Sequence, residues 1–205
     1  MCGRFSLHTV RERIIEHFGI EEFSEIGVTP RFNIAPSQAI PVVRLNASGR
    51  RELVPLRWGL IPHWAKEPNT GYSTINARAE TVATKPAFRD SFRRKRCLIP
   101  ADGFFEWQPV GGKSKQPWFI HPKGADLFGF AGLWDHWQAP DGKVIETFTI
   151  IVTDTNELLR PIHDRMPSIL APSDYDRWLD VQEFDRDALQ GLLRPYPPER
   201  LEAYP

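Results

Sequence analysis

Hydrophobic and polar positions along this chain follow two periods, and the extended period dominates. Apolar residues spaced three to four apart predict a helix over residues 9–18, where Thr9 and Glu12 form a capping-box pattern. Three further short stretches also have helical character, at residues 85–94, 173–179 and 185–193. Helices are therefore expected to form only a small part of the fold.

Extended runs rich in β-branched and aromatic residues fill most of the remaining chain. They lie at residues 38–45, 52–59, 96–108, 117–122, 127–138 and 144–153. Gly111-Gly112 and Asp141-Gly142 supply hairpin turns between them. Many strands and few helices predict an α+β fold, in which one domain over residues 1–205 has a curled, barrel-like antiparallel β-sheet core and peripheral short helices. Because residues 201–205 resemble the start of another strand, we expect this domain to lack a short C-terminal segment.

The composition fits a soluble protein with one core. The 205 residues are 41% hydrophobic, no apolar run approaches the ~18 residues of a membrane span, and the first residues lack the apolar core of a signal peptide. We therefore expect a cytoplasmic protein with no membrane partner. Two cysteines are too few for a disulfide scaffold, and the six histidines show no metal-ligand spacing, so neither a metal nor another cofactor is expected.

A net charge of zero hides an uneven distribution of charge. Residues 1–100 carry 16 Lys and Arg against 9 Asp and Glu, whereas residues 101–205 carry 10 against 17. A basic half can attract phosphate, although the two halves can also simply neutralise each other in the folded protein.

The first candidate for chemistry is Cys2, which follows the initiator methionine. A small residue at position 2 favours removal of Met1, which would leave Cys2 with a free α-amine beside its thiol. Both groups have reference pKa values near 8 to 8.5. Such an aminothiol forms an imine with an aldehyde, and the thiol then closes a thiazolidine ring. A cysteine at position 2 is, however, weak evidence by itself, since most are incidental.

Asn76 and Arg78 form a second candidate. They lie two residues apart, so on an extended segment they share one face. An amide and a guanidinium on one face suit a sugar-phosphate, and the simpler interpretation is a surface strand with a capping asparagine.

A carboxylate and a histidine complete the set. Glu106 stands between Phe105 and Trp107, which would raise its pKa if they enclose it, although strand alternation can equally leave it solvated. His163, a proton shuttle at neutral pH, lies near Arg165, a residue suited to anions, and its simpler role is structural.

These pieces occur in one order along nearly the whole chain. They are MCGRF at the start, RFNIAP at 31–36, WGLIPHW at 58–64, INARAET at 75–81, RCLIPADGFFEW at 96–107 and IHDRMP at 162–167. Together they resemble the SRAP family of SOS-response-associated peptidase-like proteins. The resemblance implies a single α+β domain that binds single-stranded DNA and single-strand/double-strand junctions and crosslinks to the aldehyde of an abasic site.

The resemblance also implies residue roles. Cys2 would be the nucleophile and Asn76 would hydrogen-bond the reacting sugar. Glu106 would move protons during imine formation and ring closure, and His163 would act as acid or base in opening the deoxyribose and in reversing the crosslink.

DNA binding would use residues around this site. Arg4, Arg78 and Arg165 would bind the phosphates flanking the lesion, and Trp64 would stack on a base. A basic track would extend along Arg89, Arg93, Arg94, Lys95 and Arg96, while Cys97 would be part of the core. The protein would be a monomer associated with the nucleoid when bound to DNA. Some relatives have two tryptophans where this chain has Trp64 followed by Ala65, so the junction contacts are expected to differ.

Three other functions compete with this interpretation. An N-terminal-nucleophile amidohydrolase would also use Cys2, but the INAR, FFEW and IHDR segments have no evident counterpart there. A non-catalytic module that binds single-stranded nucleic acid would suit the basic N-terminal half. A peptidase acting on other proteins is suggested by the family name, whereas the only proteolysis we expect is the removal of Met1, autocatalytic or by an aminopeptidase.

Overall fold

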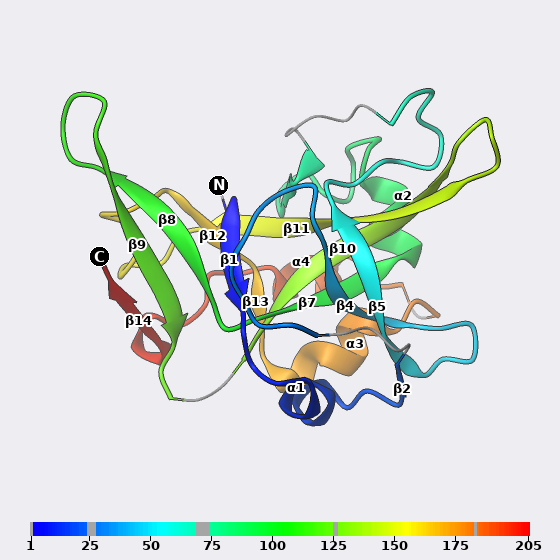
Figure 1. Ribbon diagram of the computed structural model, residues 1–205, viewed down its shortest axis with the longest axis horizontal. Helices are drawn as coiled ribbons and strands as arrows, with labels where there is room; N and C mark the ends of the chain where they lie inside the picture. Colours follow the sequence, from blue (N-terminus) through cyan, green and yellow to red (C-terminus); the bar gives the residue numbers. More distant parts are fainter. Residues whose placement is uncertain (1, 24–27, 69–73, 125–126, 183) are drawn as a thin grey trace.

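The computed structural model describes residues 2–23, 28–68, 74–124, 127–182 and 184–205. Two β-sheets dominate it, and the helices lie around them (Figure 1). The first sheet has the strand order β14-β9-β8-β1-β3. Its strands are β1 (Arg4–Leu7), β3 (Arg31–Ile34), β8 (Gly103–Pro109), β9 (Lys115–Pro122) and β14 (Leu201–Tyr204).

The second sheet closes on itself. Its path runs β12-β11-β10-β7-β4-β5-β2, and β11 also pairs with β5, so that β4, β5, β7, β10 and β11 form a closed barrel. These strands are β4 (Ala39–Leu45), β5 (Arg51–Trp58), β7 (Arg96–Ala101), β10 (Phe128–Gln138) and β11 (Val144–Asp154). Short strands extend the sheet, namely β2 (Glu22–Phe23), β6 (Asn76–Arg78), β12 (Arg165–Pro167) and β13 (Ile169–Leu170). The predicted α+β fold with a barrel-like, largely antiparallel core is confirmed.

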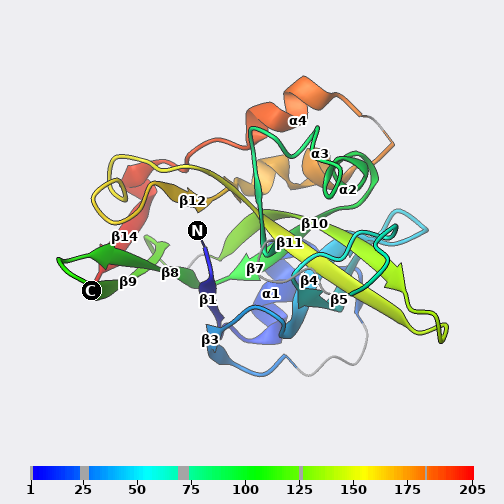
Figure 2. The same ribbon diagram turned by 90° about the horizontal axis from the view of Figure 1, so that it is seen from above.

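The helices are short and peripheral, as predicted. They are α1 (Arg11–Phe18), α2 (Arg89–Arg94), α3 (Tyr175–Leu179) and α4 (Arg186–Leu192), with 3-10 turns at Pro172–Asp174 and Pro198–Arg200. Figure 2 shows α2, α3 and α4 along one side of the sheets, and α1 contacts α3, with the rings of Phe18 and Tyr175 5.3 Å apart. Within the described ranges, no helix has the length and apolar character that a membrane span requires.

The predicted capping box at α1 is wrong. Val10 occupies the N-cap position without a side-chain hydrogen bond, because Thr9 is bound elsewhere. Its hydroxyl and its backbone N–H both donate to the Asp102 carboxylate, the latter at 3.0 Å. Asp102 also accepts the His8 N–H at 2.5 Å, so it ties the end of β1 to the turn before β8.

That turn divides the strand predicted over residues 96–108. Residues 96–101 form β7 in the barrel, and residues 103–109 form β8 in the other sheet, so the chain changes sheets at Asp102. Gly103 permits the change because its backbone lies against β9: an added Cβ would lie 2.7 Å from the Ile120 carbonyl oxygen. The turn therefore positions β8, which carries Glu106.

Aromatic side chains join the two sheets. The ring of Phe5, from β1, lies 5.2 Å from that of Trp58 and 6.1 Å from that of Phe130, both in the barrel. Trp58 is fixed by a 2.9 Å hydrogen bond from its indole N–H to the Ile75 carbonyl oxygen. Cys97 is fully buried in this core, as the sequence predicts.

The close approach at Gly103 gives a testable prediction for stability. Gly103→Ala should lower the free energy of unfolding by about 1–3 kcal/mol, since the methyl group would overlap β9. Urea denaturation of Gly191→Ala provides the control: this glycine lies in α4, nothing is within 4 Å of its added Cβ, and the change should stabilise by about 0.5–1 kcal/mol. Equal effects of the two substitutions would contradict the assignment.

Candidate functional site

The N-terminal strand brings Cys2 close enough to Glu106 of β8 for the carboxylate to affect its thiol. In the β1–β8 ladder Arg4 is opposite Phe105, the residue before Glu106, and Phe5 is opposite Phe104. Cys2 is fully buried. Burial, and secondly the charge of Glu106, raise the pKa of its thiol, which keeps the sulfur protonated at neutral pH. Met1, whose removal the sequence predicts, lies outside the described residues.

Glu106 is on the covered face of β8. Alternation along the strand buries Phe104 and Glu106, while Phe105 and Trp107 are half-buried on the opposite face. The residue is 3% exposed, and this burial raises the pKa of its carboxyl group to about 7. The sequence left two environments possible for Glu106, desolvated or exposed to solvent, and the structure shows the desolvated one. The cause differs from the one expected, because Phe105 and Trp107 do not enclose the carboxylate.

His163 lies on the other side of this carboxylate. Its Nε2 is 3.8 Å from Glu106 Oε2, and its Nδ1 accepts the Arg165 N–H at 3.0 Å. Burial lowers the pKa of the imidazole, although the exposed Asp164 carboxylate, 2.9 Å from Nδ1, opposes this. The Arg165 N–H favours the neutral tautomer with its proton on Nε2, toward Glu106, whereas the Asp164 carboxylate favours a proton on Nδ1.

The loop that carries His163 is fastened to the sheet of β8. Gln108 donates from Nε2 to the Pro161 carbonyl oxygen at 3.0 Å, and its Oε1 accepts the Trp118 indole N–H at 2.9 Å. Trp118 lies directly opposite Glu106 in the β8–β9 ladder. Gln108 and Trp118 therefore fix the position of His163 relative to Glu106, a role that sequence reasoning missed because no local pattern links residues so far apart.

Asn76 presents a buried amide. It begins β6, which pairs in parallel with β11 so that Asn76 is opposite Ile150. Its Nδ2 donates to the Ile150 carbonyl oxygen at 3.5 Å, while its buried Oδ1 has no hydrogen-bond partner among the residues that the structure describes. A buried acceptor without a partner is costly, and a ligand hydroxyl would satisfy it.

Arg78 and Arg165 share a face with Asn76, because β6 and β12 both pair with β11 in matching register. Arg78 is exposed, and within the described ranges it forms no ion pair. Arg165 is bound by two carboxylates, Glu80 and, at 3.2 Å, Asp154. The hydrogen bond to Glu80 raises the pKa of Arg165, so its charge is already largely matched.

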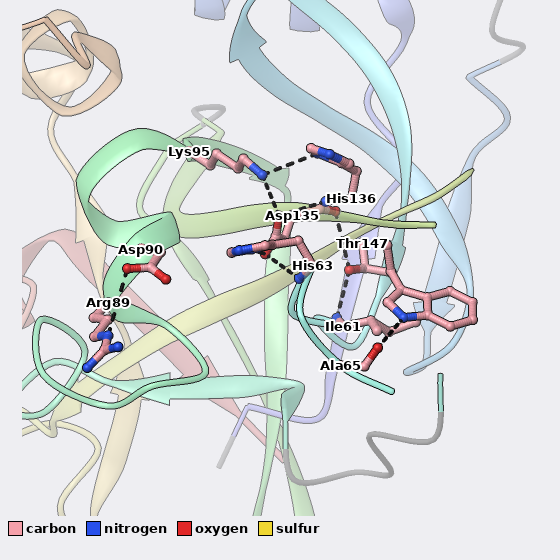
Figure 3. Close-up of polar contacts among 10 residues, drawn as sticks. Ile61, His63, Ala65, Arg89, Asp90, Lys95, Asp135, His136 and Thr147 are labelled. Atoms are coloured by element: carbon pink, nitrogen blue, oxygen red, sulfur yellow. Dashed lines mark hydrogen bonds and ion pairs between the residues drawn. The ribbon is translucent and has the colours of Figure 1, made fainter. Parts of the chain in front are cut away.

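The other two predicted DNA contacts differ in their surroundings. Arg4 donates from Nη1 to Asn33 Oδ1 at 3.0 Å, a neutral partner that leaves its charge available. Trp64 is 54% exposed on the segment after β5. Figure 3 shows this segment held by a backbone N–H bond from Ile61 to Thr147 Oγ1 at 2.8 Å. The Ala65 carbonyl oxygen also accepts the Trp137 indole N–H at 2.7 Å. The backbone of this loop is therefore held in place on both sides of the exposed Trp64 indole.

The arrangement thus brings Cys2, Glu106 and His163 close together and places Asn76 and the arginines on an adjoining ladder. Among the described residues, no three His, Cys, Asp or Glu side chains are grouped to hold a metal ion. The groups that this site offers are the thiol of Cys2, the carboxyl group of Glu106 with its raised pKa and the imidazole of His163.

Comparison with known proteins identifies the family. The profile of the family described as SOS response associated peptidase (SRAP) matches residues 1–205. The chain belongs to the SRAP family.

Relatives of known name support this membership. The chain is 48% identical over 205 residues to the abasic site processing protein YoqW of Bacillus subtilis strain 168, covering 100% of this chain and 91% of the relative. It is 36% identical over 197 residues to the abasic site processing protein HMCES of Gallus gallus, covering 81% of this chain and 58% of that one.

Solved structures show the same SRAP fold. A protein from Bacteroides thetaiotaomicron superposes with a TM-score of 0.88 at 30% identity, covering 99% of this chain and 91% of that one. A protein from Bordetella bronchiseptica gives a TM-score of 0.84 at 26% identity, with 98% of both chains covered.

The buried carboxyl group of this SRAP domain predicts how stability depends on pH. The pKa of Glu106 is higher in the folded than in the unfolded chain, so the folded state binds the proton more tightly. This contribution is complete below about pH 4.5 and is lost as the pH rises through about 7, by at most about 3 kcal/mol. Urea denaturation from pH 4 to 8 should therefore show a fall in the wild type that is smaller in Glu106→Gln. If the free energy of unfolding changed with pH by the same amount in both proteins, the raised pKa of Glu106 would be contradicted.

Proposed function

We propose that this SRAP protein captures abasic sites in single-stranded DNA by forming a covalent crosslink through Cys2, and thereby shields the lesion. The observation that carries this proposal is the burial of Cys2 beside Glu106, whose pKa is raised to about 7 and whose Oε2 lies 3.8 Å from His163 Nε2. The names of its relatives, abasic site processing proteins from bacteria and vertebrates, support the same function.

The reaction begins after hydrolysis of the Met1–Cys2 peptide bond, which exposes the Cys2 amine. That amine has a reference pKa near 8, so a useful fraction is neutral at physiological pH. Its lone pair attacks the aldehyde carbon, C1′, of the ring-opened deoxyribose. The resulting carbinolamine loses its hydroxyl as water, with a proton donated by Glu106, and an imine remains.

Ring closure uses the thiol of the same residue. The sulfur forms a bond to the imine carbon, the C=N electron pair moves to nitrogen, and the thiol proton reaches that nitrogen through the Glu106 carboxylate. One water is released overall and nothing is oxidised or reduced. Because burial raises the pKa of the thiol, a base beside it is required, and Glu106 with a pKa of about 7 both donates and accepts protons at neutral pH.

His163 and Asn76 act on the sugar. The abasic sugar is mainly a closed hemiacetal, so opening requires a proton to leave the C1′ hydroxyl and another to reach the ring oxygen. Neutral His163, which has one nitrogen that donates a proton and one that accepts it, is suited to this exchange and to its reversal. The buried Oδ1 of Asn76 would accept a hydrogen bond from a sugar hydroxyl and hold C1′ near the amine.

The surrounding side chains suit single-stranded DNA and single-strand/double-strand junctions, bound by a monomer. Arg4 and Arg78 offer charge to flanking phosphates, and Trp64 offers a flat face for stacking. Arg165 would share its guanidinium between phosphate and its two carboxylate partners, so its contribution is expected to be smaller.

A crosslinking assay tests the covalent step. Purified protein is mixed with a single-stranded oligonucleotide that contains one abasic site, and the products are separated on a denaturing gel and weighed by mass spectrometry. We expect a DNA–protein species that lacks the mass of Met1 and one water, that requires the lesion, and that is lost in Cys2→Ala. Cys97→Ala, which removes the other buried cysteine, should still crosslink.

The same assay separates the alternative functions. Salt-sensitive binding without a covalent product would favour a non-catalytic binding module. Glutaminase activity that depends on Cys2 would favour an N-terminal-nucleophile amidohydrolase, and cleavage of a generic protein substrate would favour a peptidase.

Rates assign the roles of the proton-transfer groups. Glu106→Gln should slow crosslinking at neutral pH by roughly 100-fold or more, because the amide can neither donate to the leaving hydroxyl nor accept the thiol proton. His163→Ala should slow ring opening and reversal of the crosslink while leaving DNA affinity nearly unchanged. Rapid-quench measurements should show wild-type rates for Glu12→Gln, an exposed carboxylate on α1. Equal rates in all of these proteins would remove both assignments.

A further inference from the structure

A basic cleft adjoins the segment that carries Trp64, and it contains three residues of the basic track expected from the sequence, Arg93, Arg94 and Lys95. It has a volume of about 420 Å³ and lies between α2 and β10. The argument concerns six of its lining residues: His63, Arg93, Arg94, Lys95, Asp135 and His136. Figure 3 shows His63, Lys95 and His136 gathered around Asp135.

Asp135 organises this cleft from within. The residue is 2% exposed, and its carboxylate accepts hydrogen bonds from the His63 N–H at 2.9 Å, from the Lys95 ammonium at 2.5 Å and from the His136 N–H at 2.9 Å. Burial alone would raise the pKa of Asp135, but the bonds from Lys95 and His63 lower it. The carboxylate is therefore ionised, and its charge is matched internally.

The same carboxylate orients the His63 ring. His63 Nδ1 lies 3.1 Å from Asp135 Oδ2, so this nitrogen is the donor and Nε2 is left for another partner. The side chain is 46% exposed, and in Figure 3 it extends from its loop toward α2. A surface histidine fixed by a buried carboxylate loses little conformational entropy when it binds a ligand.

The remaining positive charge of the cleft is available to an anion. Arg93 and Arg94 are exposed at the end of α2, and Arg93 has its guanidinium 5.8 Å from the Phe184 ring. No described residue forms a hydrogen bond or ion pair with the Arg94 guanidinium. Asp90, which also borders the cleft, is 3.8 Å from Arg89, so its charge has a cationic neighbour.

The continuity between this cleft and Trp64 identifies the anion. Trp64 directly follows His63, and the segment that carries both is bound to β10 and β11 through Asp135 and Thr147. In Figure 1 the N-terminus and α2 both lie toward the upper side of the molecule. A base stacked on the indole brings its own backbone phosphates to the neighbouring residue.

We propose that this cleft binds a backbone phosphate of the DNA that flanks the abasic site, through the Arg94 guanidinium and His63 Nε2. The proposal rests on the proposed function and specifies how the DNA lies beyond Trp64. It also divides the basic track expected from the sequence. Arg96 is not part of it: the residue is 1% exposed, and its guanidinium donates to the Trp178 carbonyl oxygen at 2.5 Å and to the Phe92 carbonyl oxygen at 2.8 Å.

Reversible binding of an undamaged oligonucleotide with a single strand and a duplex arm tests the proposal. Fluorescence anisotropy from about 50 to about 200 mM salt gives the slope of log affinity against log salt. Arg94→Gln should weaken binding several-fold and reduce this slope by about 0.7–0.9, the effect of one lost phosphate contact. His63→Ala should also weaken binding of the oligonucleotide. Arg94→Lys, which keeps the charge, should keep the slope.

Arg13→Gln is the matched control, because Arg13 is an exposed arginine on α1, which Figure 1 shows at the opposite, lower side of the molecule. Equal slopes for Arg94→Gln and Arg13→Gln, in a protein that still crosslinks to abasic DNA, would overturn the cleft proposal alone. The cleft proposal would also be overturned if Arg94→Gln weakened the binding of inorganic phosphate but left the affinity for DNA unchanged. A reduced slope in a protein that never crosslinks would support the cleft and overturn the proposed function.

Discussion

The packing of Phe5 between the two sheets holds the N-terminal strand in place, and the candidate site depends on it. The ring lies against Trp58 and Phe130 of the barrel, and the backbone on either side pairs with β8. Burial of a phenylalanine side chain contributes roughly 1.5–3 kcal/mol, which is enough to hold a chain end that would otherwise fray. Because Cys2 is only three residues away, this contact limits how far the Cys2 thiol reaches along β8, the strand that carries Glu106.

Burial of Glu106 lowers the stability of the fold at neutral pH. A carboxyl group with a pKa of about 7 costs folding free energy at neutral pH, since its charged form is poorly solvated. The fold offsets this cost with the aromatic core beside it and with the Gln108 contacts that hold the His163 loop over the same face. The same burial that raises the pKa of Glu106 to about 7 brings its titration into the range in which a carboxyl group can both donate and accept protons.

Local patterns in the sequence predict most elements of this fold, and long-range contacts account for the errors. The α1 helix and the barrel strands follow from hydrophobic spacing, and Asp185 caps α4 through the Ala188 N–H as its sequence indicates. The capping box at Thr9 fails because Asp102, far away in sequence, competes for the same groups. The short strands β6 and β12 form because they pair with β11, which lies between them. Their own sequences show no hydrophobic periodicity that would predict them.

The same distinction applies to charge. Acidic residues of the second half form ion pairs with part of the excess of cations in residues 1–100. The pairs are Arg44 with Glu146 at 2.7 Å, Arg51 with Asp176 at 2.6 Å and Lys95 with Asp135 at 2.5 Å. The view that the two halves neutralise each other is therefore correct for these residues. What remains is a smaller set, including Arg78 and Arg94, whose guanidinium groups have no carboxylate partner within the described residues. A protein with zero net charge can bind DNA through such residues, because affinity for a phosphate depends on unmatched charge within a Debye length, about 8–10 Å at moderate salt, and not on the sum over the chain.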